Sequence, residues 1–134
     1  MSSVIVGFID TAAGHVALDA AIEEARLRSA KLVVVSSMVG GDRESDEEYV
    51  RTADALEGVE ARLVETGLEH EVRSYVRGQT PAQDLKQAAD ELDARLIVIG
   101  TRRRSAVGKA LLGSNALEIL YDAPCPVLCV RAEG

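Results

Sequence analysis

Apolar residues along this chain gather in short runs separated by longer amphipathic segments. Four runs of mostly aliphatic residues have the length and composition of buried strands: residues 4–9, 31–37, 96–99 and 126–130. A fifth segment, residues 69–76 (EHEVRSYV), alternates charged and apolar positions. This alternation predicts a strand with one exposed face, at a sheet edge.

Helical patterns fill the intervals between these strands. Residues 12–29 are rich in alanine, and residues 47–66 carry apolar side chains at helical spacing. Gly67 follows the second pattern, where a helix commonly ends on a glycine. A third helix is expected over residues 81–92, because Pro81 suits the first position of a helix.

The resulting order alternates strands and helices from one end of the chain to the other. Right-handed crossovers then give an α/β fold, a doubly wound parallel sheet of five strands with helices on both faces, in one domain spanning residues 1–134. Ligands bind such sheets at the carboxyl ends of the strands, where the strand order reverses. If the first and fourth strands flank that point, Asp10 and Gly100 converge on one crevice.

Composition supports this fold and excludes some partners. Hydrophobic residues make up 47% of the 134 residues and aromatic ones only 3%, so the core must be aliphatic, as in a covered parallel sheet. A net charge of −7 opposes general binding to nucleic acid or to an anionic membrane. The sequence shows no signal peptide and no apolar run of membrane-spanning length, so we expect a cytoplasmic protein. Cys125 and Cys129 are expected to be small buried hydrophobic residues in a reducing compartment.

A basic loop follows the fourth strand and is bracketed by glycines. Gly100 ends that strand, and four cations follow within eight residues: Arg102, Arg103, Arg104 and Lys109. Gly113 and Ser114 then precede another helix. Glycines admit a ligand close to the backbone, and helix N-terminal amides attract anions, so this pattern predicts a phosphate site.

Three common nucleotide motifs do not match this region. Gly108 and Lys109 are followed by Ala110 and lack the glycine that a P-loop requires six residues before the lysine. The first strand is followed by no G-x-G-x-x-G turn, and Asp10 stands without the acidic cluster of a phosphoacceptor domain. The spacing that does fit is G-x2-G-x9-G-[ST], with Arg103 at its second glycine position.

That spacing, the flanks LIVIG, LLGS and APCPVLCVR, and the turn Gly78-Gln79-Thr80-Pro81 resemble the universal stress protein family. The resemblance covers residues 3–131 and is to the small, single-domain type. It implies an adenine nucleotide α-hydrolase-like fold with strand order 3-2-1-4-5. It also implies a stress-response or signalling module that binds ATP or another adenine nucleotide, with or without Mg²⁺.

By the same resemblance, Asp10 lies near the adenosine end and the backbone at Ser37 reads the adenine. Gly100 and position 103 line the phosphate loop, while Gly113, Ser114 and Asn115 contact the phosphates through amides and a hydroxyl. Arg103 either obstructs the phosphate site or clamps a phosphate as a bidentate donor. Together with Arg102, it could instead hold another small anion.

Structural roles stand beside these binding roles. Asp10 could cap the helix that follows it, and Ser114 could cap its own helix, with Gly113 as a turn residue. For Arg104 we favour a solvated loop position.

No catalytic group of side chains is evident, so we expect a binding protein with at most slow ATP hydrolysis. The alternative is a dimeric scaffold of the same fold that binds no nucleotide. The last strand is apolar on both faces although it lies at a sheet edge, and an apolar edge is normally paired or covered. The resemblance implies that this strand pairs antiparallel with its copy in a homodimer, through Val127, Leu128 and Val130.

Overall fold

The computed structural model of the protein describes residues 2–38, 46–76, 79–102 and 113–132. Strands and helices alternate through these residues, as the hydrophobic pattern predicts. The elements are β1 (Ser3–Gly7), α1 (Ala12–Arg28), β2 (Lys31–Met38), α2 (Asp46–Thr66), β3 (His70–Val76), α3 (Pro81–Glu91), β4 (Ala94–Arg102), α4 (Ser114–Asp122) and β5 (Val127–Ala132).

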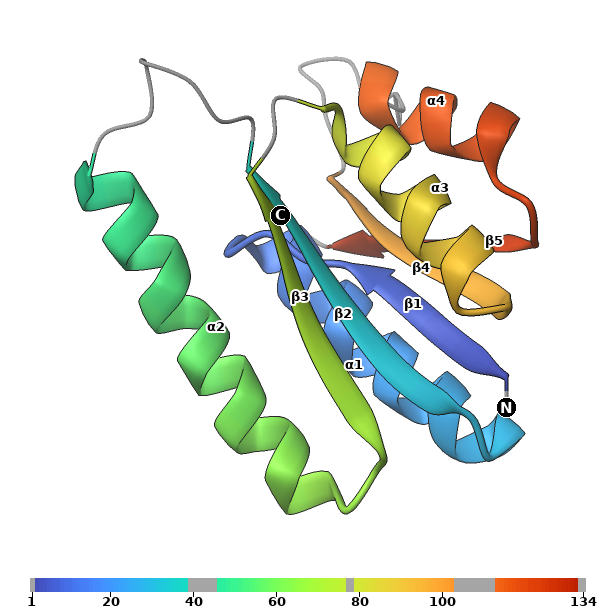
Figure 1. Ribbon diagram of the computed structural model, residues 1–134, viewed down its shortest axis with the longest axis horizontal. Helices are drawn as coiled ribbons and strands as arrows, with labels where there is room; N and C mark the ends of the chain where they lie inside the picture. The colour runs from blue at the N-terminus through green and yellow to red at the C-terminus, as the bar shows by residue number, and fades with distance from the viewer. Residues whose placement is uncertain (1, 39–45, 77–78, 103–112, 133–134) are drawn as a thin grey trace.

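The strands form one parallel sheet in the order β3-β2-β1-β4-β5 (Figure 1). This confirms the expected doubly wound fold and places β3 and β5 at the two edges. The order reverses between β1 and β4, so ligands are expected at the carboxyl ends of these two strands.

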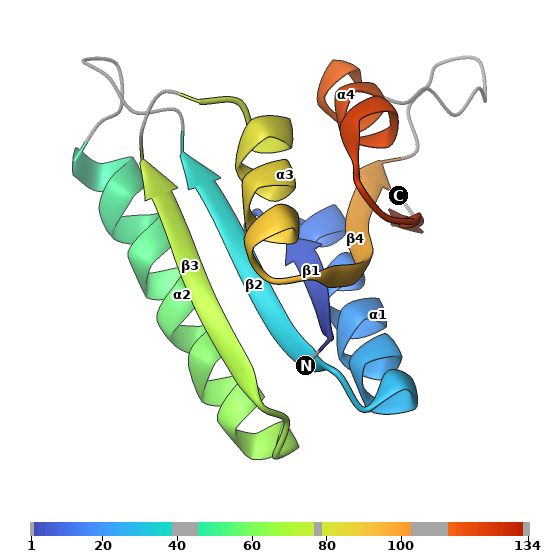
Figure 2. The ribbon, with the colours of Figure 1, turned by 45° about the vertical axis from the view of Figure 1, so that its right-hand side comes forward.

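Helices cover both faces of the sheet, α1 and α2 on one and α3 and α4 on the other (Figure 2). Alternate residues of the central strands point to opposite layers: Val4 and Val6 pack toward α1, whereas Ile5 packs toward α3. All three are fully buried, as are Val33 and Val34 of β2. The aliphatic composition therefore fills two cores, one on each side of the central strands.

Several strand ends differ from those that the hydrophobic runs predict, among them the carboxyl ends of β1, β4 and β5. β1 ends at Gly7 rather than at Ile9, because the chain turns there and the Thr11 amide donates to the Ile9 carbonyl at 2.8 Å. β4 continues past Gly100 to Arg102, because its last residues still pair with β5. β5 likewise runs on to Ala132. Two paired strands continue as long as their backbones remain hydrogen-bonded to each other, even where their side chains are not apolar.

The helix ends follow side-chain chemistry that the sequence partly revealed. Thr11 caps α1 by accepting a hydrogen bond from the Gly14 amide, so the alternative that Asp10 is this cap is wrong. Thr80 and Gln83 form a capping box at the start of α3, with Pro81 at its first position. Gly67 adopts a φ of 75° after α2, a conformation that favours glycine.

The two cysteines are less buried than expected. Cys129 is exposed on the edge strand β5, and Cys125 is half-buried, so burial of both was wrong. Even so, partial burial raises the pKa of each thiol, with a further contribution from the charge of Asp90 at Cys125. Both side chains therefore stay thiols rather than reactive thiolates at neutral pH. Within the described ranges, no helix is long and apolar enough to cross a membrane.

Candidate functional site

A cavity of about 150 Å³ opens at the carboxyl ends of β1, β2 and β4, where α3 and α4 begin. It lies at the point where the strand order reverses, as the fold predicts. Three predicted site residues, Ser37, Gly100 and Asn115, line it together. The other lining residues are mostly apolar: Gly7, Phe8, Ile9, Gly14, Val35, Pro81, Leu85, Ile99, Ala116 and Ile119.

Two lining glycines are required by close packing of the chain against itself. A Cβ atom on Gly100 would lie 2.0 Å from the carbonyl oxygen of Ala13, and one on Gly14 would lie 1.7 Å from that of Ile9. The start of α1 is therefore pressed against the ends of β1 and β4, and this contact forms one wall of the cavity. The need for glycine at position 100 comes from this packing, whether or not a ligand binds.

Gly113 differs, because none of the described residues requires a glycine there. It is the N-cap of α4 with ordinary extended dihedrals (φ −68°, ψ 164°), and an added Cβ atom would meet nothing within 4 Å. Ser114 is the first helical residue rather than the cap, so the alternative that Ser114 caps this helix is wrong. Because Gly113 has no side chain, no side-chain oxygen at the N-cap accepts from the amides of the first turn.

Within the described ranges, no backbone acceptor is paired with the amides at the start of α4, so these donors are left for a ligand. A helix leaves its first amides without partners inside the helix, and here the first amide bonded back is that of Leu117, to the Gly113 carbonyl at 3.1 Å. Gly113, Ser114 and Asn115 are all exposed. Amides pointing out of an exposed helix N-terminus, with the positive end of the dipole, suit an anionic group.

Asp10 turns away from this cavity. Its carboxylate lies 2.9 Å from His15 Nε2, and the His15 ring packs edge-on against Phe8 with 5.2 Å between ring centroids. Both side chains border a separate hollow on the α2 side, together with Arg51 and Arg62. Contact of Asp10 with an adenosine stays a prediction from the family resemblance.

The predicted basic loop is only partly described. Arg102 ends β4, and its backbone pairs with Ala132 of β5. Arg103, Arg104 and Lys109 lie outside the described residues. The two roles that the sequence leaves open for Arg103 therefore both stand.

Asp84 is a site residue that sequence reasoning missed. It sits in the first turn of α3, is 1% exposed, and accepts a hydrogen bond from the hydroxyl of Ser37. An acidic residue in a first turn usually faces solvent and complements the helix dipole. Its spacing was the available signal, because Asp84 lies one turn before the buried Ala88, on the apolar stripe of the helix.

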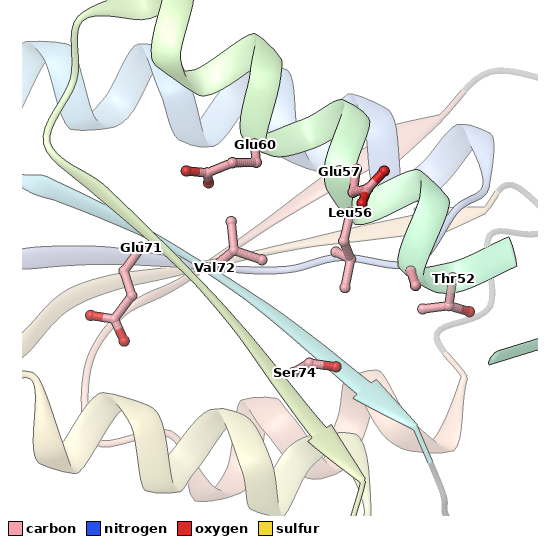
Figure 3. A pocket seen from close by; sticks show the side chains of 8 residues that line it. Thr52, Leu56, Glu57, Glu60, Glu71, Val72 and Ser74 are labelled. Carbon is pink, nitrogen blue, oxygen red and sulfur yellow. The ribbon is translucent and has the colours of Figure 1, made fainter. Parts of the chain in front are cut away.

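A larger groove of about 470 Å³ runs between α2 and β3, and it is a poor candidate for an anion site (Figure 3). Leu56 and Val72 point into it, and its rim is acidic, with Glu57 and Glu60 on α2. Glu71 points to the other side of the sheet. The residues labelled in the figure are Thr52, Leu56, Glu57, Glu60, Glu71, Val72 and Ser74.

The charge of Glu71 is already matched within the protein. Lys31 donates to it at 2.9 Å, and Arg73 donates to its second oxygen. The Arg73 guanidinium, followed by Lys31, lowers the pKa of this carboxyl. In the part of the chain that the structure describes, no three side chains of the metal-ligating kinds gather as a metal site.

Comparison with known proteins identifies relatives of the whole chain. The model of the universal stress protein family matches residues 1–131. A universal stress protein of Mycolicibacterium smegmatis is 38% identical over 131 residues, which cover 98% of each chain.

Solved structures agree with this match. A universal stress protein from Archaeoglobus fulgidus superposes with a TM-score of 0.82 at 37% identity, covering 96% of this chain and 98% of that one. A structure of the universal stress protein from the same organism in complex with dAMP has a TM-score of 0.75 at 33% identity, covering 96% and 97%.

Proposed function

The chain belongs to the universal stress protein family, and we propose that it binds an adenine nucleotide in the cavity at the carboxyl ends of β1 and β4. One observation carries the proposal: an apolar cavity and an exposed helix N-terminus share the residue Asn115. A nucleotide has the matching form, a flat apolar base joined to an anion.

The cavity suits the base rather than the whole nucleotide. Its volume, about 150 Å³, is below the roughly 300–1,000 Å³ usual for drug-sized ligands. Its walls include Val35 of β2, Leu85 of α3 and Ile99 of β4, so they favour a planar apolar ring. The sugar and phosphates then extend out of the cavity toward α4.

The phosphate group is placed at the first turn of α4. No described residue fills the space beside Gly113, and the amides of the first turn can donate to a phosphate oxygen. The dAMP complex of the Archaeoglobus fulgidus relative supports an adenine nucleotide as the ligand class. ATP is the ligand that the sequence motif favours.

Binding rather than catalysis is the proposed activity, in a stress-response or signalling role. Hydrolysis of a nucleotide needs a base and usually a metal-binding carboxylate close to the phosphates. Asp10, the carboxylate that the sequence offered, pairs with His15 outside the cavity. The proposal therefore includes no hydrolytic step and no magnesium ion held by protein side chains.

Gly113→Asp tests this placement, because stability and affinity are expected to change in opposite directions. An aspartate at an N-cap accepts from the amides of the first turn and interacts favourably with the helix dipole, so stability should rise by about 0.5 kcal/mol. The same carboxylate occupies the phosphate position, and affinity for AMP and ATP should fall at least about tenfold. Isothermal titration calorimetry, with and without Mg²⁺, and urea denaturation measure the two effects.

Gly58→Asp is the matched control, because it makes the same chemical change at an exposed position of α2 with open space around it. Its affinity should equal that of the unaltered protein. If Gly113→Asp binds nucleotide with the affinity of the unaltered protein, the phosphate does not bind at the first turn of α4. No binding by the unaltered protein at millimolar nucleotide would overturn the proposal and favour the dimeric scaffold.

A further inference from the structure

Ser37 is a polar residue on an otherwise apolar part of the cavity wall, and it is hydrogen-bonded to the buried Asp84. Ser37, near the end of β2, lines the cavity, and its hydroxyl donates to the carboxylate oxygen Oδ2 of Asp84 on α3. Asp84 is 1% exposed. Its other oxygen, Oδ1, is buried and has no hydrogen-bond partner among the described residues.

A buried aspartate is unusual at this position, which indicates a role other than packing. Aspartate is almost never fully buried unless it is paired. A buried acceptor without a partner lowers the free energy of unfolding. Its position shares a face with Ala88 and lies beside Leu85, where an apolar side chain would pack. Such exceptions in a folded protein gather at functional sites.

The pair fixes the direction of the Ser37 hydroxyl. A carboxylate can only accept hydrogen bonds, so the Ser37 hydrogen is directed to Asp84. The hydroxyl oxygen then keeps only its lone pairs for a ligand. Toward the cavity, Ser37 is therefore a hydrogen-bond acceptor and not a donor.

We propose that Ser37, positioned by Asp84, is a specificity filter that accepts the 6-amino group of a purine and rejects a 6-oxo group. This inference rests on the proposed nucleotide function and deepens it. Adenine carries an amino donor at position 6, whereas hypoxanthine and guanine carry an oxygen acceptor there. A 6-oxo group would face the Ser37 oxygen as a second acceptor, and both would lose a hydrogen bond on leaving water.

AMP and IMP are the probes, because they share the ribose and phosphate and differ only around position 6. Calorimetric titration of the unaltered protein should show AMP binding at least about tenfold more tightly than IMP. Using the ratio of the two affinities removes any effect of a substitution on phosphate binding or on overall charge.

Asp84→Asn is the decisive variant, because an amide can donate to the Ser37 oxygen and free its hydrogen for the ligand. The preference for AMP should vanish or reverse toward IMP, a change that a merely structural role of Asp84 does not produce. Ser37→Ala removes the hydroxyl oxygen that is proposed to accept from the 6-amino group, so AMP and IMP should bind about equally. It keeps the proposal testable if Asp84→Asn does not fold.

Asp90→Asn is the control, with the same loss of charge on the same helix at an exposed residue that pairs with Lys86. It should keep the AMP preference of the unaltered protein. An unchanged AMP-to-IMP ratio in Asp84→Asn and Ser37→Ala would overturn the filter and leave nucleotide binding intact. Binding of neither nucleotide by the unaltered protein would instead overturn the proposed function, and the filter with it.

Discussion

The ring of His70, the first residue of β3, is held at both nitrogens, by α2 on one side and by the turn before β3 on the other. Nδ1 lies 2.9 Å from the Leu68 carbonyl oxygen, and Nε2 lies 3.0 Å from a carboxylate oxygen of Glu60. Both partners are acceptors, so both bonds form fully only when the ring carries two protons. The Leu68 carbonyl, and then Glu60, accordingly raise the pKa of His70 despite its partial burial.

The raised pKa makes this link dependent on pH. A histidine with a higher pKa in the folded state stabilises it fully below the unfolded pKa of about 6.5, and the effect is lost as pH rises through the folded pKa. His70→Gln should therefore lower the free energy of unfolding by roughly 0.5–1 kcal/mol more at pH 5.5 than at pH 8.5. Urea denaturation at the two pH values measures this.

Glu60→Gln is the companion variant. It removes the carboxylate and keeps the Leu68 bond, so part of the pH dependence should persist. Equal losses of stability at the two pH values in His70→Gln would show that the protonated ring gives no stabilisation.

Glycines and acidic residues mark the limit of sequence reasoning at the scale of single residues. The motif treats Gly100 and Gly113 alike, yet the first is required by contact with Ala13 and the second has open space around it. Asp84 was missed because an acidic residue in a first turn is ordinarily exposed, whereas this one is buried. These distinctions depend on the approach of segments far apart in sequence, which a spacing pattern does not contain.

At the scale of elements, β5 is the least protected strand. Among the strands that the structure describes it pairs with β4 alone, and its Leu128 is 37% exposed. The neighbouring helix α4 also exposes Leu117, Leu120 and Tyr121, the last to 84%. An edge strand with an exposed leucine fits the homodimer that the sequence predicts through Val127, Leu128 and Val130, and this dimer stays a prediction.

Leu128→Lys tests the dimer, because a charge on this edge opposes pairing with a second copy. We expect the unaltered protein to sediment as a dimer and Leu128→Lys to sediment as a monomer at the same concentration. Val64→Lys on α2 is the control, since Val64 is 63% exposed on another element. A monomeric unaltered protein, or a Leu128→Lys protein that remains dimeric, would contradict the proposed interface.

The type of each element was predictable, because helices and strands repeat their apolar positions with different periods. The residues at which the strands end were less predictable. The alternating pattern placed β3 at an edge, and the structure confirms it. The apolar run after Ser3 suggested a longer β1, but a strand ends where its backbone turns, here at the hydrogen bond between Thr11 and Ile9. Side-chain hydrophobicity does not report this turn.

At the scale of the whole molecule, the doubly wound topology explains how distant residues meet. Ser37, Gly100 and Asn115 come from β2, β4 and α4, and the reversal of strand order brings them to one cavity. The alternation of strands and helices predicted the parallel sheet, and the strand order that the family resemblance implies placed the site at this edge. They could not predict that Asp10 would turn toward His15, because that choice depends on side-chain packing against Phe8.

The most direct test of the account is to record backbone amide chemical shifts during titration with AMP. Binding in the cavity should shift Ile9, Ser37 and Asn115 most, and should leave the groove between α2 and β3 unchanged. Saturable shifts confined to that groove, for example at Leu56 and Val72, would contradict the account, and so would the absence of any shift.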